Sequence, residues 1–599
     1  MSKVEHTEDR LADFTTDRRV ILLSVMALII GLISAVVAYV LVWLIGVITN
    51  LAYYHRFSST FTSPAGNHLG VWAVLVPVVG GLIIGLMARY GSEKIRGHGI
   101  PEALEAILIG RSRIEPKVAL LKPLSSALSI GTGGPFGAEG PIIMTGGAFG
   151  SIFAQLFHLS SAERKTLLVA GAAGGMAAIF ASPIAAVLLA VELLLFEWKP
   201  RSFIPVTVAS LAASALRVPL LGAGPIFPVP EHAPLSAAGL GYALLVGIVA
   251  GLGSGGLTAL VYGFEDLFIS KFKKLHWMWW PTLGGLCIGI GGLIDPRVLG
   301  VGYEVIHGLL RGEYVGMALL GLLIVKALVW SIALGSGTSG GVLAPLLMMG
   351  GALGALMAPF LPIGSPGLWA MIGMAAMMGG TMRSPLTSLI FTLELTHDTN
   401  LLPGLLTGCI AAHAVTVLLL RRSILTEKVA RRGHHLTREY SVDLLEVLRV
   451  GEVMDTEAPT VPATMKVTDL AEKMTQRSLH TAARQCALIV NAAGKLVGII
   501  TLSDVLRALE APADSEATVL DAGSADLIVA YEDEVLREAV ARMLRNDIGR
   551  LPVVSRQDAH QIVGYLDRSR VMAARQRRFE EEHVRERHFP LRTQFPWAQ

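Results

Sequence analysis

One acidic residue, Glu139, lies inside a glycine-rich stretch, Gly131–Gly150, in an otherwise apolar part of the chain. Glycine lets the main chain turn sharply and bring N–H groups up to a ligand, and Pro141 suits the first turn of a helix. A helix that begins here directs free N–H groups and its positive dipole end at whatever lies in front. Such a helix start binds anions, and Glu139 would compete with the anion when charged and leave when protonated.

Glu139 also has a simpler interpretation, because acidic residues are favoured in the first turn of any helix. Ionisable groups at membrane depth are functional as a rule, and this favours a role in gating.

The glycine-rich stretch occurs twice. Gly335–Gly354 aligns with Gly131–Gly150 without a gap, and nine of the twenty positions are identical. Downstream, Ser182–Leu193 resembles Ser384–Leu395 at nearly the same offset. Glycine- and proline-interrupted apolar segments at matching places in two halves indicate a transporter's binding site near the middle of the membrane. We therefore expect two helix starts, one from each half, to face a single small anion.

Composition identifies a polytopic membrane protein. Hydrophobic residues make up 52% of the 599 residues and charged residues only 16%, well below the roughly 25% of soluble domains. The net charge of +3 gives no argument for nucleic-acid binding. The three cysteines are far apart, which excludes a disulfide framework and a paired-cysteine metal site. No removable signal peptide is expected before the first apolar run.

Apolar runs predict the spans of the membrane part, residues 20–422, whose halves meet at about 234/235. We expect spans or partial helices at 20–51, 68–90, 167–196, 240–268, 281–294, 316–334, 368–382, 384–396 and 402–420. A loop is expected at 160–165 and an irregular segment at 210–236. The turn at Gly99-Ile100-Pro101 opens a short helix. Four basic residues mark a cytoplasmic face under the positive-inside rule: Arg111, Arg113, Lys117 and Lys122.

The remainder of the chain has the composition of a soluble protein. Residues 1–19 form a polar tail and residues 423–449 a charged linker. Within 450–573, the order strand, helix, strand, strand, helix occurs twice, at about 450–511 and 521–573, which predicts two α/β modules. Residues 574–599 form a charged C-terminal tail.

Taken together, these motifs resemble the CLC family of chloride channels and chloride/proton antiporters with C-terminal tandem CBS domains. The three family signatures are present in order as GHGIP (Gly97–Pro101), GAEGP (Gly137–Pro141) and GGVLAP (Gly340–Pro345). The resemblance covers nearly the whole chain. It implies an all-α polytopic membrane domain with an inverted internal repeat, a homodimer with one anion pathway per subunit, and a cytoplasmic α/β pair of CBS domains.

The resemblance also implies roles for individual residues. Glu139 corresponds to the external gating glutamate, which also handles protons. The anion would be bound by the following residues: His98, Gly99, Ile100, Ala138, Gly140, Val342 and Leu343. The family's central tyrosine is not evident, and two alignments place Arg421 or Ile424 at its position. Neither a metal nor a permanent cofactor is implied.

Several positions depart from the family pattern. His98 replaces the usual serine, and it either alters anion selectivity and pH sensitivity or packs away from the pathway. Leu193 stands where the proton-coupled members carry a glutamate, so the internal proton route loses its usual group unless water or Glu197 substitutes. A passive voltage- or pH-gated chloride channel is the simplest reading, and chloride/proton antiport is the alternative. Lys326 would either add positive potential to the pathway or be paired.

In CBS domains, a Thr/Ser–x–x–Asp sequence after the last strand often contacts the ribose of an adenine nucleotide. The first module has Thr501 and Asp504, whereas the second has Asp567 and Arg570. One nucleotide site, or only a dimerising scaffold, is therefore expected. Glu192 and Glu394, which the repeat relates, are expected to bond helix ends.

Other classes fit less well. A metalloprotease would need a HExxH helix, which the sequence lacks, and a divalent-cation transporter would need carboxylates along its path. A nucleotide-sensing membrane protein without transport would leave the glycine repeat unexplained. We therefore expect a non-enzymatic transporter of chloride or another small anion, with protons as the second candidate substrate. Its expected location is the plasma (inner) membrane, with both termini in the cytoplasm.

Overall fold

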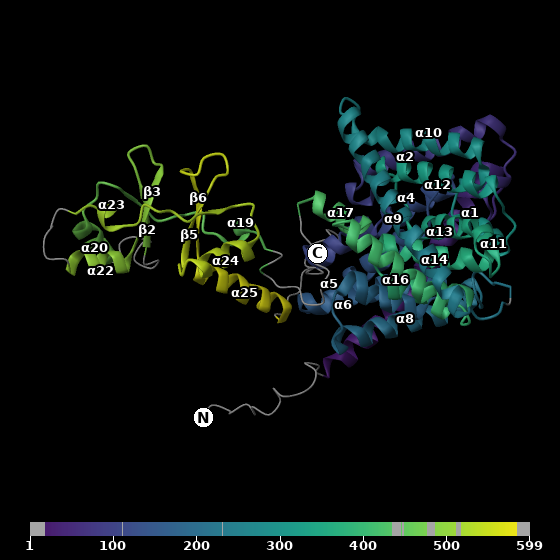
Figure 1. Ribbon diagram of the computed structural model, residues 1–599, viewed down its shortest axis with the longest axis horizontal. Helices are drawn as coiled ribbons and strands as arrows, with labels where there is room; N and C mark the ends of the chain where they lie inside the picture. Colours follow the sequence, from purple (N-terminus) through teal and green to yellow (C-terminus); the bar gives the residue numbers. More distant parts are fainter. Residues whose placement is uncertain are drawn as a thin grey trace, which may run out of the picture. The chain divides into compact units, whose positions relative to one another are not determined.

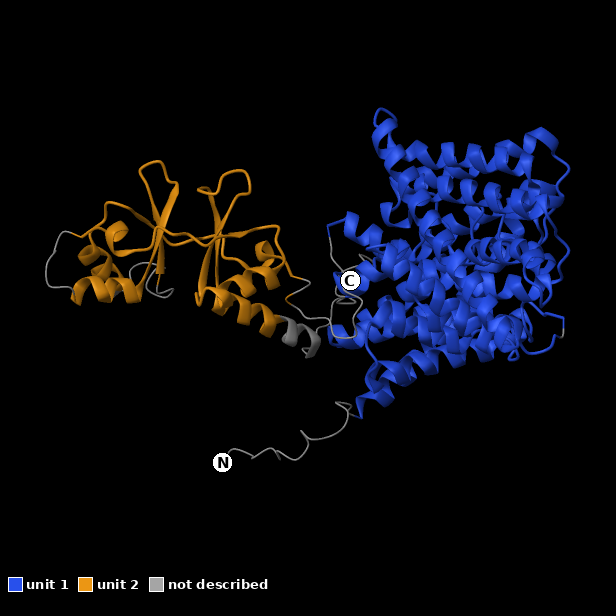
Figure 2. Cartoon of the chain, viewed as in Figure 1, with its two compact units in different colours: residues 1–433, 583–599 blue, residues 434–582 orange. Residues whose placement is uncertain are grey.

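The computed structural model describes residues 18–110, 112–230, 232–433, 445, 448–475, 486–510 and 517–583. The predictions for residues 1–17 of the N-terminal tail, Arg111, residues 434–444 and 446–447 of the linker, and residues 584–599 lie outside this part. The chain divides into two compact units, residues 1–433 with 583–599 and residues 434–582 (Figure 2). Figure 1 labels the elements of both units.

In the first half of the membrane unit, eight helices follow one another: α1 Arg19–Tyr54, α2 Leu75–Tyr90, α3 Ile100–Leu108, α4 Pro116–Gly131, α5 Glu139–Gln155, α6 Ser161–Phe180, α7 Pro183–Leu189 and α8 Pro200–Leu221. The second half repeats them in the same order: α9 Ala237–Lys271, α10 Trp280–Ile294, α11 Tyr303–Leu310, α12 Met317–Gly335, α13 Leu343–Met357, α14 Pro366–Met382, α15 Pro385–Thr396 and α16 Leu402–Leu419. A final helix, α17 Ile424–Arg431, has no counterpart in the first half.

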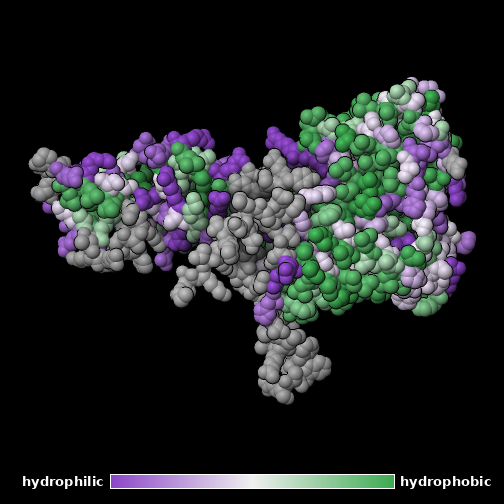
Figure 3. All heavy atoms as spheres, turned by 90° about the horizontal axis from the view of Figure 1, so that it is seen from below, coloured by the Kyte–Doolittle hydropathy of each residue, from purple (hydrophilic) through white to green (hydrophobic). Residues whose placement is uncertain are grey.

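This order confirms an all-α polytopic domain with an internal repeat. Among the described residues, eight helical segments are long and apolar enough to cross a membrane. Hydrophobic side chains cover most of the face of this unit that is visible in Figure 3. Lipid cannot pair backbone polar groups, so helices that satisfy their own N–H and C=O groups are the structure expected there.

Small residues set the closest helix contacts. In the α5–α6 pair, a Cβ on Gly146 or Gly150 would overlap the carbonyl oxygen of Gly171 or Leu167. The α13–α14 pair repeats this arrangement, with Gly350 against Gly373 and Gly354 against Trp369. The predicted close packing at spacing four is therefore confirmed in both halves.

Three predictions about element boundaries were wrong. Residues 167–196 do not form one span, because α6 ends at Phe180, Ala181 adopts a positive φ of 52°, and Pro183 begins α7. A π-helical turn, Ala190–Leu195, follows α7. Residues 210–221 are not irregular, because α8 continues to Leu221 despite its internal prolines, which membrane helices tolerate.

The third wrong prediction is the loop at 160–165. Helix α6 begins at Ser161, and Ser160 is its N-cap. The Ser160 hydroxyl accepts the amide hydrogen of Glu163 at 3.2 Å, and the Glu163 carboxylate accepts that of Ser160 at 2.7 Å. This reciprocal pair is the capping box, which the Ser-x-x-Glu spacing signals in the sequence.

The second unit contains two three-stranded sheets of the same topology. The first has β1 Thr460–Pro462, β2 Cys486–Val490 and β3 Leu496–Thr501, with helices α20 Val467–Thr475, α22 Leu502–Glu510 and α23 Val519–Ala522. The second has β4 Ala530–Tyr531, β5 Arg550–Val554 and β6 Ile562–Asp567, with α19 Val450–Val453, which precedes the first sheet in the chain, α24 Leu536–Arg545 and α25 Arg568–His583. In each sheet the first pair of strands is parallel and the second antiparallel.

The two sheets share a buried contact. The Cys486 thiol and the Tyr565 hydroxyl lie 2.7 Å apart, and both residues are fully buried. Burial raises the pKa of the Tyr565 phenol, so this contact is between neutral groups. The predicted repeat of α/β modules is therefore present, and the two modules form one unit.

Candidate functional site

The two glycine-rich stretches meet at one point in the membrane unit. Gly137 and Gly341 pair as an isolated antiparallel bridge, in which Gly341 N–H donates to Gly137 O at 2.8 Å and Gly137 N–H to Gly341 O at 3.3 Å. Helix α5 begins two residues after Gly137, and α13 begins two residues after Gly341. The repeat therefore brings two helix N-termini to a common centre, as the sequence predicts.

Glu139 joins these two helix starts. It is the first residue of α5, it is fully buried, and its Oε1 accepts the Ala344 amide hydrogen in the first turn of α13 at 3.0 Å. The other oxygen, Oε2, has no hydrogen-bond partner among the described residues. A Cβ on Gly137 would overlap this carboxylate. The carboxylate thus occupies an anion position at the N-terminus of α13.

The remaining predicted backbone residues lie around this centre. Ala138 and Val342 are the N-caps of α5 and α13, and Gly140 and Leu343 lie in the first turns. A Cβ on Gly140 would overlap the carbonyl oxygen of His98. The structure therefore brings the GAEGP, GGVLAP and GHGIP motifs together.

A hydrogen bond to α3 fixes the GHGIP loop. Gly99, the N-cap of α3, donates its amide hydrogen to Glu102 Oε2 at 2.9 Å, so this amide is already engaged. Ile100, the first residue of α3, is fully buried. His98 is 4% exposed, and its Nδ1 has no hydrogen-bond partner within the described structure.

Two buried lysines support the loops that precede the helix starts. Lys122 of α4 donates to Ile95 O at 2.8 Å, to Gly97 O at 2.7 Å and to Ser339 Oγ at 3.0 Å. Lys122 is therefore fully buried and engaged by these loops, and its predicted place at the cytoplasmic face stays a prediction. Lys122 precedes Lys326 by 204 residues, which is also the offset between the two glycine-rich stretches. This spacing could have shown from the sequence that the two lysines are related by the repeat.

Lys326 of α12 makes the corresponding contacts in the second half. It is fully buried and donates to Val298 O at 2.8 Å and to Gly300 O at 3.3 Å. Of the two alternatives for Lys326, the structure supports pairing with backbone carbonyls. Each lysine fixes the loop before a short helix, α3 or α11.

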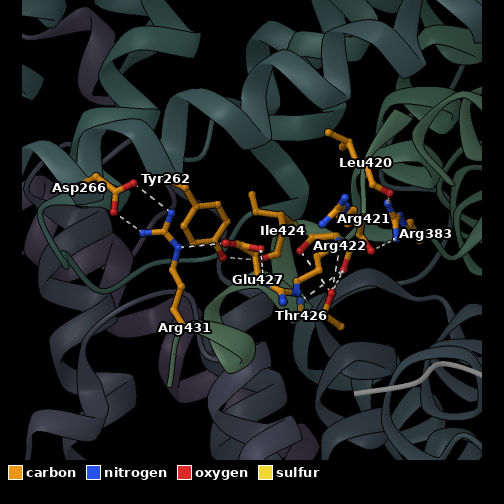
Figure 4. A network of polar contacts seen from close by, with 11 residues as sticks. Tyr262, Asp266, Arg383, Leu420, Arg421, Arg422, Ile424, Thr426, Glu427 and Arg431 are labelled. Atoms are coloured by element: carbon orange, nitrogen blue, oxygen red, sulfur yellow. Dashed lines mark hydrogen bonds and ion pairs between the residues drawn. The ribbon is translucent and has the colours of Figure 1, made fainter. Parts of the chain in front are cut away.

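The two candidates for the family's central tyrosine differ in position (Figure 4). Arg421 is exposed and lies in the turn before α17, so the structure does not bring it to the glycine-rich centre. Ile424 begins α17 and is fully buried, and its carbonyl oxygen accepts the Tyr262 hydroxyl hydrogen. Arg431 lies over the Tyr262 ring and pairs with Asp266.

Glu192 and Glu394 bond helix ends in the opposite halves, as predicted. Glu192 accepts the amide hydrogens of Leu386 at 3.3 Å and Thr387 at 2.9 Å, at the start of α15. Glu394 of α15 accepts those of Ile184 at 3.0 Å and Ala185 at 2.8 Å, at the start of α7. This reciprocity is what a two-fold relation between the halves requires.

A cavity of about 750 Å³ reaches the loops at the centre. It extends to Gly335 and Gly337 at the start of the second glycine-rich stretch and to Lys428 of α17. A Cβ on Gly97 would overlap the Lys428 ammonium. Lys428 therefore lines the cavity and also contacts the loop that carries His98.

Comparisons with known proteins decide the family. Residues 80–417 match the model of the voltage gated chloride channel (CLC) family, and residues 450–511 and 520–577 match that of the CBS domain. The chain belongs to the CLC family. It is a multi-pass membrane protein of a family that transports anions.

Relatives agree with this assignment. The voltage-gated ClC-type chloride channel ClcB of Escherichia coli O17:K52:H18 is 30% identical over 381 residues, which are 62% of this chain and 90% of the relative. A structure titled as a slow cyanobacterial Cl⁻/H⁺ antiporter has 22% identity and a TM-score of 0.62, covering 70% of this chain and 99% of that one. A eukaryotic CLC transporter structure has 18% identity and a TM-score of 0.60, covering 92% and 98%.

Within this CLC protein, the two carboxylates that lie nearest to Leu193 in the described sequence, those of Glu192 and Glu197, are both engaged. Leu193 is fully buried in the π-helical turn, and the neighbouring Glu192 is engaged by α15. Glu197 accepts the Ser202 hydroxyl hydrogen at 2.6 Å and lies 3.5 Å from Lys199 and 3.6 Å from Arg201. Glu197, the predicted substitute for the missing glutamate, is therefore engaged by Ser202 and by two cationic side chains.

The predicted nucleotide residues of the CBS pair bond each other. Thr501 ends β3, and its amide and hydroxyl donate to Asp504 Oδ2 at 2.9 and 2.6 Å. In the second module, Asp567 Oδ1 accepts the Arg570 amide hydrogen at 2.7 Å, and the Arg570 guanidinium pairs with Asp455. In the second module, Arg570 is thus engaged in an ion pair. In the first module, Thr501 and Asp504 contact each other, in the Thr-x-x-Asp arrangement that the sequence predicts.

Proposed function

We propose that this CLC protein is a passive chloride channel whose pathway passes between the starts of α5 and α13 and is closed by Glu139. The observation that carries the passive mechanism is the buried Leu193, with Glu192 and Glu197 both engaged nearby. A proton route from the cytoplasm needs a group that takes up and releases a proton, and these residues do not provide one. Opening, by voltage or by pH, requires the Glu139 carboxylate to leave Ala344.

Chloride/proton antiport is the second candidate. It is favoured by the retained Glu139 and by the cyanobacterial structure of similar fold that is titled an antiporter. Water entering from the cavity would then have to replace the missing glutamate.

Paired chloride and proton fluxes from proteoliposomes test the proposal, with wild type and Glu139→Gln. We expect an outward chloride gradient to release chloride without moving protons in either protein. Proton movement driven by the chloride gradient in wild type, and lost in Glu139→Gln, would instead establish exchange. Absence of halide flux in both proteins would contradict chloride transport itself.

The same proposal includes the oligomeric state of the protein and its location in the cell. We propose a homodimer in the plasma (inner) membrane, with both termini in the cytoplasm and no enzymatic activity. The CBS unit is proposed to regulate transport, with an adenine nucleotide at Thr501 and Asp504 as its ligand. The remote alternative, a nucleotide sensor without transport, is excluded by any anion flux in the experiment above.

A further inference from the structure

The connection between α9 and α10 lies at the ends of two membrane spans. Helix α9 ends at Lys271, a 3₁₀ turn occupies Trp277–Trp279, and α10 begins at Trp280. The segments Ala237–Lys271 and Trp277–Ile294 are both long and apolar enough to cross a membrane. The residues between them therefore lie where the hydrocarbon layer meets the lipid headgroups and water.

Helix α2 ends at the same place. It lies beside α10 in Figure 1, and a Cβ on Gly85 would overlap the carbonyl oxygen of Met278 in the 3₁₀ turn. The last two residues of α2, Arg89 and Tyr90, are both exposed. A further cation and a further aromatic ring thus adjoin the connection between α9 and α10.

Exposed cations and exposed aromatic rings occur together on this surface. Four exposed cations form what we call the basic patch: Arg89, Lys271, Lys273 and Lys274. The rings of Tyr90, Phe272 and Trp279 are 81%, 37% and 41% exposed. Lysine and arginine beside tryptophan and tyrosine are typical of the membrane–water interface, where the rings lie at headgroup depth.

The carboxylates near the patch do not neutralise it. Glu93 pairs with Arg96 at 3.0 Å, and Asp266 pairs with Arg431. Glu265 lines the cavity of about 750 Å³, where it interacts with the charges of Arg96 and Arg431. Even if Glu265 is counted fully against the basic patch, four positive charges face one negative charge. Within the described structure, none of the four cations has an ion-pair partner.

We propose that the basic patch binds the headgroups of anionic phospholipids. Ammonium and guanidinium groups near a membrane surface attract anionic lipids, and each of the four cations can pair with a lipid phosphate. The exposed rings need the apolar layer that a bilayer lipid supplies and that a free phosphate does not. This lipid contact is a property separate from the proposed chloride transport.

Native mass spectrometry of the purified full chain tests the proposal, in detergent micelles that contain equal amounts of phosphatidylglycerol and phosphatidylcholine. We expect the wild type to retain phosphatidylglycerol preferentially. The triple variant Lys271→Gln/Lys273→Gln/Lys274→Gln should lower the ratio of bound phosphatidylglycerol to bound phosphatidylcholine by about tenfold, because each cation near the surface contributes to the attraction. Substitution of the same three lysines by arginine conserves the charge and should preserve the ratio.

The control variant removes three exposed cations elsewhere in the membrane unit, by Arg18→Gln, Lys117→Gln and Arg311→Gln. The net charge falls by the same amount, and the ratio should stay at the wild-type value. Equal ratios in the wild type and the lysine-to-glutamine variant, or an equal fall in the control variant, would overturn the proposal.

A soluble headgroup distinguishes a lipid from a free phosphate. An excess of glycerol 3-phosphate should not displace the bound phosphatidylglycerol, and displacement would show a free-phosphate site instead. None of these readouts depends on chloride flux, so failure of this inference and failure of the proposed function are distinguishable.

Discussion

At the scale of single residues, carboxylates in one half of the membrane unit accept backbone amide hydrogens from the other half. The Glu139 carboxylate reaches Ala344, Glu192 reaches Thr387, and Glu394 reaches Ala185. Each carboxylate satisfies amide hydrogens at a helix start, where four backbone donors lack intrahelical partners. In the proposed function, Glu139 differs from the other two because it competes there with the transported anion.

Removal of the Glu192 carboxylate should destabilise the membrane unit. Glu192→Ala leaves the amides of Leu386 and Thr387 and the Thr387 hydroxyl without their acceptor. An unsatisfied buried donor costs about 1–3 kcal/mol, so we expect a clear fall in the thermal unfolding midpoint in detergent. Glu115→Ala is the control, because the exposed Glu115–Lys94 pair contributes little. Equal midpoints for the two variants would contradict this role of Glu192.

At the scale of elements, the contacts of α5 with α6 and of α13 with α14 determine how closely the helices approach. Gly150 lies against the Leu167 carbonyl and Gly354 against that of Trp369. No side chain fits between the backbones at these points. The site depends on this packing because α5 and α13 carry the two helix starts.

Gly150→Val should therefore reduce both folding yield and transport. Overpacking of a close contact typically costs about 1–3 kcal/mol, and the displaced α5 would carry Glu139 with it. Gly321→Ala in α12 is the matched control, because no atom lies within 4 Å of a Cβ added there. Monodispersity in size-exclusion chromatography and chloride flux measure the two effects. A Gly150→Val protein as well behaved as Gly321→Ala would show that the close contact is dispensable.

The sequence allowed the helix starts to be predicted, because glycine, proline and the repeat offset all act locally. Pro141 and Pro345 lie in the first turns of α5 and α13 as expected. The breaks within residues 167–196 were missed because hydropathy does not distinguish one span from two helices joined at Ala181. The role of Lys122 was missed because a basic residue near a helix start is ambiguous until the loop that it contacts is known.

At the scale of the whole molecule, the chain consists of a membrane unit and a CBS unit, each with its own core. Among the described residues, the hydrophobic core of the membrane unit extends no further along the chain than Leu425. A chain that ends at Gly433 should therefore fold and conduct chloride, with any control by the CBS unit removed. Chloride flux from proteoliposomes compares the two lengths, and a truncated chain that inserts but conducts nothing would contradict this independence.

Nucleotide binding is a separate prediction for the CBS unit. Asp504 holds the Thr501 hydroxyl, so Asp504→Ala should abolish stabilisation of the full chain by ATP or AMP in a thermal shift assay. Arg570→Ala should retain it, because the second position is occupied by the ion pair with Asp455. Stabilisation that survives Asp504→Ala but not Arg570→Ala would move the site to the second module.

The central claim is that the Glu139 carboxylate occupies an anion site formed by the two glycine-rich repeats. The most direct measurement is an anomalous difference map of Glu139→Ala crystals grown in bromide. We expect a bromide peak within hydrogen-bond distance of the Ala344 amide, where Glu139 Oε1 lies in the wild type. A map with bromide elsewhere in the membrane unit and none at Ala344 would contradict it.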